Sequence, residues 1–327
     1  MSMKGLDLHR AFFEECGLPL LRERFPEELP KLAVASVGFG SDRFGADDES
    51  SRDHCWEPGF QIFSARLDEK ALSAIEAHLY ENLPWEFRGF RRSDCPHYVN
   101  GIRAWTIDEF FSSITSFARP PEDDLVWLRI MEEDLFNVTN GEVFHDPSGD
   151  LTGRREVFRY YPENVWRFKL AGRAFRVGCL LYQLERSLAH GEAVTAHMML
   201  SEALRETMRF TFLVNRRYAP YDRWLHWGFR RLPLLAPELE PLVLEACDAS
   251  DGKEKARICR GIVDVLTRHV YGAGLAKRGE RWWHDLWQAV DGRLREFPLV
   301  GCVGAEYRYA SQFALGNAMQ TTFSLRG

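Results

Sequence analysis

Residues 31–67 read KLAVASVGFGSDRFGADDESSRDHCWEPGFQIFSARL. Of all segments of the chain, this one carries the clearest prediction of the fold. An apolar run at 32–37 leads into a glycine turn, Gly38-Phe39-Gly40-Ser41, and a second apolar run follows at 60–67. Apolar runs of this length, bounded by turn residues, predict two strands. The glycines between them allow backbone N–H groups to come close to an anion.

Gly40 and Ser41, with Asp53 about a dozen residues later, are the residues of this segment best suited to chemistry. Transfer of a phosphoryl-type group needs a turn that approaches a triphosphate and carboxylates that hold Mg²⁺ against it. Gly40 and Ser41 would supply the turn, and Asp53 would supply a carboxylate and act as the catalytic residue. The alternative is structural, namely a glycine-rich β-turn followed by an acidic loop in solvent.

The composition is that of a globular protein with room for two packed lobes in its 327 residues. The net charge of −6 argues against a protein that binds nucleic acid over its whole surface. Seven widely spaced cysteines without a Cys-x-x-Cys pair predict a reduced, cytoplasmic chain. No apolar run approaches about 18 residues, so we expect no membrane partner.

The periodicity predicts an α+β fold with two domains. Segments of helical and strand-like character alternate within residues 1–120, where a third strand is expected at 97–106, and this pattern indicates a small mixed sheet. Residues 121–327 are mainly helical in pattern and predict a bundle. Helices are expected at 6–25, 70–82, 124–137, 192–217, 239–248, 253–271 and 279–295.

The run GFGSDRFGADDESSRDHCWEPGF resembles the signature of a bacterial domain family of unknown function within the polymerase-β-like nucleotidyltransferase superfamily. NGEVFHDPSGDLTGRREVFRYYP and FLVNRRYAPYDRW resemble later blocks of that family, so the likeness covers most of the chain. The resemblance implies a nucleotidyltransferase-like first lobe, with a ligand site between the lobes beside Gly40 and Ser41. It also implies a nucleoside triphosphate as substrate or ligand and Mg²⁺ as the cofactor.

Two positions depart from the superfamily pattern, which has an Asp-x-Asp pair followed by a third carboxylate on a later strand. Asp53 matches the first carboxylate, but Cys55 stands at the second position, where a soft thiol would be a poor ligand for Mg²⁺. The expected strand at 97–106 contains no acid, and Arg103 stands near the expected place of the third carboxylate, with Asp108 the nearest acid downstream. Arg103 would bring a positive charge that substitutes for a metal beside phosphates.

Three residues of the helical lobe are further candidates for binding the nucleotide. Arg186 continues an otherwise apolar helical stripe, so it either pairs with an acid in the core or faces the cleft between the lobes. Arg217 and Tyr218 follow a helix end, where cations are favoured in any case, and the alternative is that they bind phosphate or base.

Three functions are compatible with these residues. In the first, the protein transfers a nucleotidyl group from a nucleoside triphosphate to a small-molecule, protein or RNA acceptor. In the second, it is a degenerate relative that binds a nucleotide or another phosphorylated ligand without turnover. In the third, it is an interaction module, such as an antitoxin-like partner, with a vestigial pocket.

Overall fold

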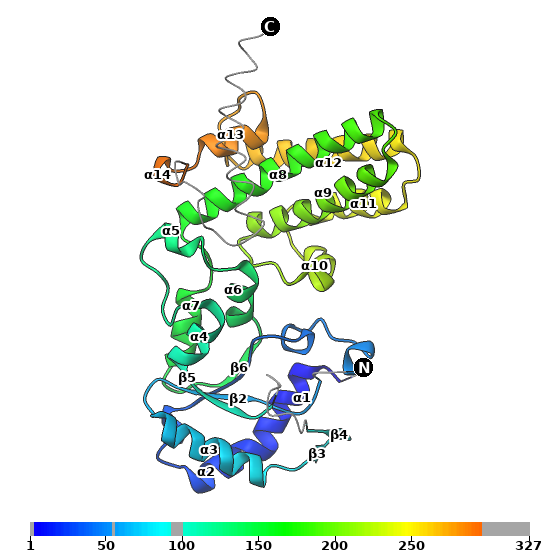
Figure 1. Cartoon of the computed structure of the whole chain (residues 1–327). Helices are drawn as coiled ribbons and strands as arrows, with labels where there is room; N and C mark the ends of the chain where they lie inside the picture. The colour runs from blue at the N-terminus through cyan, green and yellow to red at the C-terminus, as the bar shows by residue number, and fades with distance from the viewer. Residues whose placement is uncertain (1–2, 54–55, 93–100, 296–327) are drawn as a thin grey trace. The chain divides into compact units, whose positions relative to one another are not determined.

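The computed structural model describes residues 3–53, 56–92 and 101–295 (Figure 1). The chain forms two compact units. The first unit consists of Met1–Glu122 and Ile130–Tyr160, and the second of Asp123–Arg129 and Tyr161–Gly327. The first unit therefore differs from the predicted domain 1–120, because residues 130–160 return to it.

The first unit is built on a four-stranded mixed sheet with the strand order β5-β2-β1-β6. Its strands are β1 (Ala33–Ser36), β2 (Gln61–Ser64), β5 (Arg103–Thr106) and β6 (Glu142–His145). β1 is antiparallel to both β2 and β6, whereas β2 is parallel to β5. The predicted α+β class with a small mixed sheet is confirmed, and β6 is a strand that the sequence did not predict.

One face of the sheet packs on N-terminal helices and on α3 (Glu69–Asn82). The helix expected at 6–25 is divided into α1 (Gly5–Phe12), a π-helical turn η1 (Phe13–Gly17) and α2 (Leu18–Arg24). Phe12, Val34 and Ile62 belong to the core between these layers. At Gly17, a Cβ atom would come within 2.5 Å of the Phe60 ring, so glycine allows the π-helical turn to lie against the core.

The opposite face of the sheet is covered by α4 (Ile107–Thr115), which follows β5 directly and brings Phe110 against Phe63 on β2, with ring centroids 5.0 Å apart. Side chains alternate between the faces of a strand, which explains why Phe63 packs here while Ile62 packs on the N-terminal helices. The other elements of this unit are α6 (Glu132–Thr139), α7 (Asp150–Val157), a 3₁₀ turn η2 (Leu29–Lys31) and a small hairpin of β3 (Glu86–Phe87) and β4 (Phe90–Arg91). The helix expected at 124–137 is divided between α6 and α5 (Asp124–Trp127), which belongs to the second unit.

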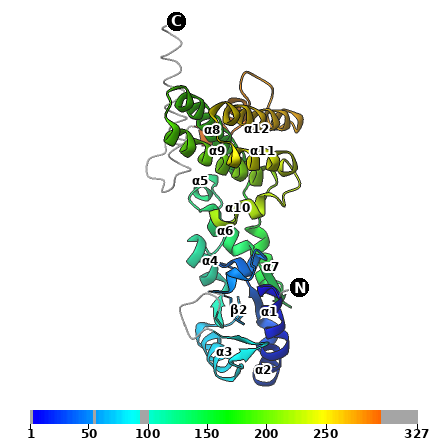
Figure 2. The ribbon, with the colours of Figure 1, turned by 90° about the vertical axis from the view of Figure 1, so that its right-hand side faces the viewer.

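The second unit is a helical bundle around the hairpin of α8 (Glu163–Ala189) and α9 (Ala193–Val214), which lie side by side in Figures 1 and 2. The Trp166 indole donates to the Leu213 carbonyl at 2.8 Å, so the start of α8 lies against the end of α9. Among the described residues of this unit, the remaining helices are α10 (Asp222–Phe229), α11 (Ala236–Asp248), α12 (Gly252–Gly272), α13 (Trp282–Gln288) and α14 (Gly292–Arg295). None of the helices in the described ranges combines the length and the apolar character needed to cross a membrane.

Candidate functional site

The glycine turn at 38–41 follows β1 and has an unusual backbone. Gly38 and Gly40 have φ angles of +102° and +116°, values that side-chain-bearing residues rarely adopt. The Asn140 side chain accepts from the Gly38 N–H at 3.0 Å and donates to the Gly38 carbonyl at 2.8 Å, which fixes the first glycine from both sides. At Gly141, a Cβ atom would lie 2.0 Å from the Ser36 carbonyl, so glycine there lets Asn140 reach the turn.

Arg43 fixes the chain just before the turn. Its guanidinium is fully buried and donates to the Val37 carbonyl at 2.6 Å and to the Gln61 side-chain oxygen at 2.8 Å. The same oxygen of Gln61 accepts from the Val37 N–H at 3.1 Å. The polar groups that flank the turn are thus satisfied by β2 and by the 3₁₀ helix η3 (Ser41–Phe44), which contains Arg43.

The tip of the turn remains open. Phe39 is 48% exposed, and Gly40 and Ser41 are half-buried. Within the described ranges, the backbone N–H groups of Phe39, Gly40 and Ser41 donate to no acceptor. Successive backbone N–H groups without a protein acceptor at a glycine turn are donors of the kind that bind phosphate oxygens.

The acids that follow the turn have structural partners. Asp47 is 2% exposed and accepts from the Gly5 N–H at 2.9 Å and from the Trp56 indole at 2.8 Å. Asp48 is exposed and accepts from the hydroxyl of Ser50 at 2.6 Å. Asp47 therefore joins the loop to the start of α1, and Asp48 stabilises the loop itself.

A buried histidine lies beneath the turn and was not singled out from the sequence. His9 on α1 is fully buried, and its Nδ1 lies 2.7 Å from the Ser36 hydroxyl while its Nε2 lies 3.1 Å from the Glu57 carbonyl. Burial, followed by the charge of Arg43, lowers the pKa of His9 to about 3, so the ring is neutral at physiological pH. Asp42, whose carboxylate lies 3.6 Å from His9 Nε2, has its pKa raised to about 6 chiefly by burial.

The predicted ligands of Mg²⁺ lie outside the described part of the chain. Asp53 ends the 3₁₀ helix η4 (Ser50–Asp53), but its side chain lies outside the described part of the chain, as does Cys55 altogether. In the part that is described, no three acidic, histidine or cysteine side chains gather as metal ligands would. The predicted roles of Asp53, Cys55 and Mg²⁺ therefore stay predictions.

Arg103 begins β5, and the sheet register aligns it with Gln61 and, through Gln61, with Ala35 on β1. It therefore lies at the same end of the sheet as the glycine turn. Its exposed guanidinium lies over the Trp105 ring, 3.8 Å from the centroid. Asp108, the nearest acid downstream, pairs with Arg154 at 2.7 Å, and the residue that caps α4 is Thr106.

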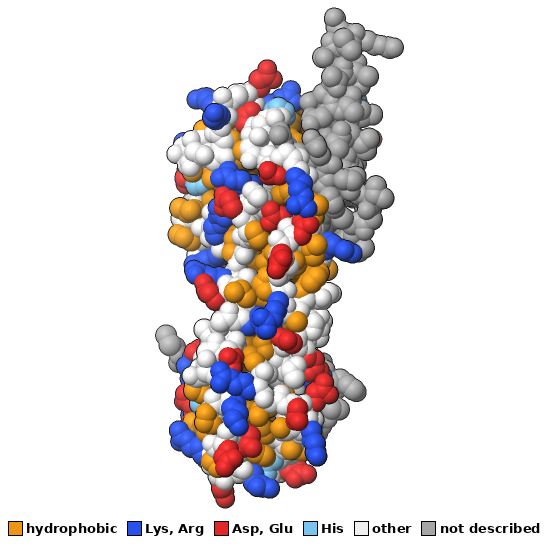
Figure 3. All heavy atoms as spheres, turned by 90° about the vertical axis from the view of Figure 1, so that its left-hand side faces the viewer, with side chains coloured by type: hydrophobic (Ala, Val, Ile, Leu, Met, Phe, Trp, Pro, Cys, Tyr) orange, Lys and Arg blue, Asp and Glu red, His pale blue; other side chains and the backbone are white. Residues whose placement is uncertain are grey.

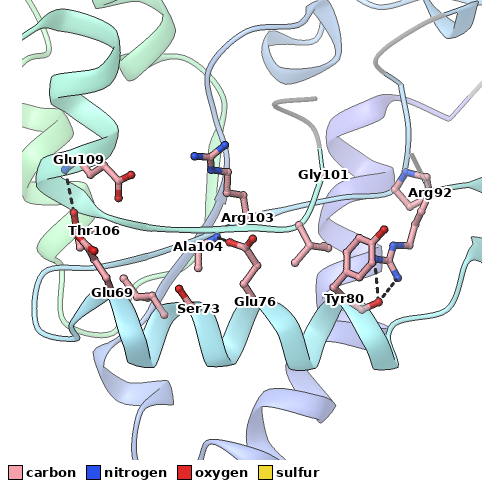
Figure 4. A pocket seen from close by; sticks show the side chains of 13 residues that line it. Glu69, Ser73, Glu76, Tyr80, Arg92, Gly101, Arg103, Ala104, Thr106 and Glu109 are labelled. Carbon is pink, nitrogen blue, oxygen red and sulfur yellow. Dashed lines mark hydrogen bonds between the residues drawn. The ribbon is translucent and has the colours of Figure 1, made fainter. Parts of the chain in front are cut away.

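A polar pocket of about 370 Å³ lies between β5 and α3, with Arg103 on its wall (Figure 4). Glu76 reaches across from α3 and accepts from the Ala104 N–H at 2.6 Å. Glu69 and Glu109 add two further carboxylates to the lining. The lining thus combines three carboxylates with the guanidinium groups of Arg92 and Arg103. The carboxylates would accept hydrogen bonds from hydroxyl or amino groups of a ligand.

The three nucleotide-binding candidates of the helical bundle, Arg186, Arg217 and Tyr218, do not lie together. Tyr218 is buried and its ring lies 4.9 Å from that of Tyr161, while Arg217 is exposed beside it at the end of α9. Arg186 lies twenty residues along α8 from Trp166, whose indole contacts the end of α9, or about 30 Å at the rise of an α-helix. It is exposed, with His190 3.4 Å from its guanidinium, so it neither continues a buried stripe nor joins Arg217 and Tyr218.

Comparisons with known proteins give two findings. A family model described as "Domain of unknown function (DUF4037)" matches residues 127–225. The crystal structure of a nucleotidyltransferase-like protein from Exiguobacterium sibiricum 255-15 is similar at 10% sequence identity, covering 84% of this chain and 80% of that chain, with a TM-score of 0.38. A search of curated proteins gives no match. A TM-score of this size does not establish a shared fold.

Proposed function

We propose that this protein is nucleotidyltransferase-like and binds the triphosphate of a nucleotide at the glycine turn. The observation that carries the proposal is the set of three successive backbone N–H groups, of Phe39, Gly40 and Ser41, that donate to no acceptor within the described ranges. Hydrogen bonds from N–H groups to a charged acceptor are stronger than those between neutral groups. The resemblance of the surrounding sequence to a nucleotidyltransferase signature supports the same ligand.

Arg103 supports the proposal through its place in the sheet. Neighbouring strands lie about 4.8 Å apart, so the start of β5 is about 10 Å from the end of β1. A long, permanently charged side chain at that distance contributes a favourable potential for a phosphate chain at the turn. The polar pocket lined by Arg103 and three glutamates would then receive the nucleoside or an acceptor that carries hydroxyl or amino groups.

Binding of nucleotides is the first test. We expect isothermal titration of ATP, GTP, CTP and UTP to give saturable binding for at least one of them. Gly40→Ala should weaken this binding at least tenfold, because alanine resists the φ angle of +116° and would reorient the N–H groups. Gly149→Ala is the matched control, since Gly149 has a φ angle of +71° and its added Cβ would meet nothing within 4 Å.

The result that overturns the proposal is the absence of saturable binding to any of the four nucleotides, with or without Mg²⁺ or Mn²⁺. Equal loss of binding in Gly40→Ala and Gly149→Ala would also contradict it, since the effect would then come from general instability.

Nucleotidyl transfer is the second question, and binding without turnover is the alternative. The acids Asp42 and Asp47 are buried and have structural neighbours, which favours the alternative unless Asp53 is enough for catalysis. Release of pyrophosphate in the presence of a divalent cation, lost in Asp53→Ala, would show transfer. Release that persists in Asp53→Ala would exclude Asp53 as the catalytic residue, and binding without release would favour the degenerate relative.

A further inference from the structure

Four arginines gather where α9 ends, and we call this group the arginine corner: Arg216, Arg217, Arg230 and Arg231. Two contacts bring its halves together. The Asn215 side chain exchanges hydrogen bonds with the backbone of Leu234, donating to its carbonyl at 2.9 Å and accepting from its N–H at 3.0 Å. At Gly228 there is no room for a Cβ, which would lie 2.8 Å from Phe212 and 3.3 Å from Pro220, so α10 packs closely on the segment after α9.

Arg216 occupies a position that normally favours glycine. The Arg216 N–H bonds to the Leu213 carbonyl and the Arg217 N–H to the Phe212 carbonyl, both at 3.1 Å, which is the Schellman pattern at a helix end. The residue at this position has a left-handed backbone, and Arg216 has a φ angle of +53°. An arginine here accepts backbone strain that glycine would avoid, which indicates that its side chain has a use.

The Arg216 guanidinium lies on the face of the Trp166 ring, 3.2 Å from its centroid, and pairs with Glu163 at 2.7 Å. Glu163 also pairs with Arg167 at 2.9 Å, so one carboxylate is shared by two cations. Arg216 remains 42% exposed. The pair therefore leaves an accessible, incompletely neutralised guanidinium supported by an aromatic ring.

A second arginine of the corner also lies over an indole ring. Arg231 lies over the Trp227 ring at 4.0 Å and donates to the Trp227 carbonyl at 2.6 Å. Burial and then the neighbouring charge of Arg230 lower the pKa of Arg231, which indicates that the two cations crowd one another. Arg217 and Arg230 are exposed and form no ion pair within the described ranges.

We propose that the arginine corner binds the phosphate groups of a single-stranded nucleic acid. Guanidinium groups that lie flat on indole rings can bind phosphate oxygens and offer planar faces to bases. The four cations are spread over two chain segments on an exposed surface, and a chain of phosphates fits such a surface better than one small anion. On the face in Figure 3, acidic and basic side chains are interspersed. This binding does not depend on a nucleotide at the glycine turn.

The test is fluorescence anisotropy of a labelled 12-nucleotide RNA, and of the same sequence as DNA, with the full-length chain between 50 and 200 mM salt. Four phosphate contacts on a single strand predict a slope of about −3 in a plot of log K against log salt, or roughly a 50-fold loss of affinity over this range. Arg217→Ala with Arg230→Ala should bring the slope to about −1.4 and weaken binding about tenfold at 50 mM salt. ATP and inorganic triphosphate are added as competitors, to test whether a small anion displaces the RNA.

Arg216→Gly separates binding from folding. Glycine suits the left-handed position, so the midpoint of denaturant unfolding should stay unchanged or rise while the affinity for RNA falls. Arg257→Ala is the control, because Arg257 is an exposed, ion-paired arginine on α12 that lies outside the corner. The affinity of this variant for RNA and its salt slope should equal those of the wild type. Gly40→Ala should also retain RNA binding, so failure here is distinguishable from failure of the proposed nucleotide site.

Three outcomes of the anisotropy measurements would overturn the proposal. They are no binding of either oligonucleotide at 50 mM salt, equal weakening by Arg257→Ala and by the double variant, and competition by triphosphate as effective as that by RNA. Binding to vesicles of anionic lipid in place of RNA would likewise contradict it.

Discussion

Replacing Asn140 with alanine tests whether the glycine turn is held by a residue 102 positions away in the chain. The Asn140 side chain is 9% exposed and satisfies both backbone groups of Gly38, which is itself buried. Alanine would leave one N–H and one carbonyl buried without partners, and each costs about 1–3 kcal/mol. We therefore expect Asn140→Ala to lower the free energy of unfolding by about 2–5 kcal/mol. The Asn140→Ala molecules that fold should also bind nucleotides more weakly, because the N–H groups of the turn would lose their fixed orientation.

Denaturant unfolding, followed by far-UV circular dichroism, measures this change. Asn82→Ala is the matched control, since the Asn82 side chain is exposed and donates to the His78 carbonyl at 2.8 Å, and its loss should cost less than about 0.5 kcal/mol. The reasoning fails if Asn140→Ala unfolds within about 1 kcal/mol of the wild type, because the lower limit of the two desolvation costs would then not be met.

Three further substitutions test other parts of the structure. Gly141→Ala should cost at least about 3 kcal/mol, because its Cβ would overlap the backbone, whereas Gly149→Ala, with a similar φ angle and free space, should cost about 1 kcal/mol; equal losses in thermal or denaturant unfolding would contradict this. Burial raises the pKa of Asp42 to about 6, so the folded state holds this proton more tightly and stability falls as the pH rises from about 4 to about 6. Asp42→Asn should thus add up to about 3 kcal/mol at pH 7 and little at pH 4, and an equal gain at both pH values would rule out the titration of Asp42 as the cause. Glu206→Ala should cost about 3–5 kcal/mol, because it leaves the Arg173 guanidinium, 2.6 Å away and 11% exposed, without this carboxylate, and a melting temperature near that of the wild type would show that the pair contributes little.

Local pattern was enough to predict most elements of this fold. The runs at 32–37 and 60–67 contain β1 and β2, and α3, α9, α11 and α12 lie within two or three residues of their predicted bounds. β6 was missed because its four residues, Glu142–His145, follow an Asn-Gly pair in a segment rich in turn residues. Its strand identity comes from pairing with β1, more than 100 positions earlier in the chain, and no local pattern carries that information.

The surroundings of the turn were harder to predict than the turn itself. His9 looked like one residue of an amphipathic helix, and only the tertiary fold places it against Ser36 and the carbonyl of Glu57. Its position next to Leu8, on the apolar side of α1, was the one available signal. Asn140 stands before Gly141, a pair that locally indicates only a turn, whereas the main contact of Asn140 is with Gly38.

These contacts give the glycine turn a property that the sequence motif alone does not explain. Gly38 is bonded to Asn140 and Val37 is bonded to Gln61 and Arg43, so the polar groups before the tip are satisfied. The N–H groups from Phe39 to Ser41 are left free of acceptors within the described ranges, although the chain around them is fixed. A flexible loop would lose conformational entropy on binding an anion, whereas this turn has already lost it on folding. Nucleotide affinity should therefore depend on distant residues such as Asn140 as strongly as on Gly40 itself.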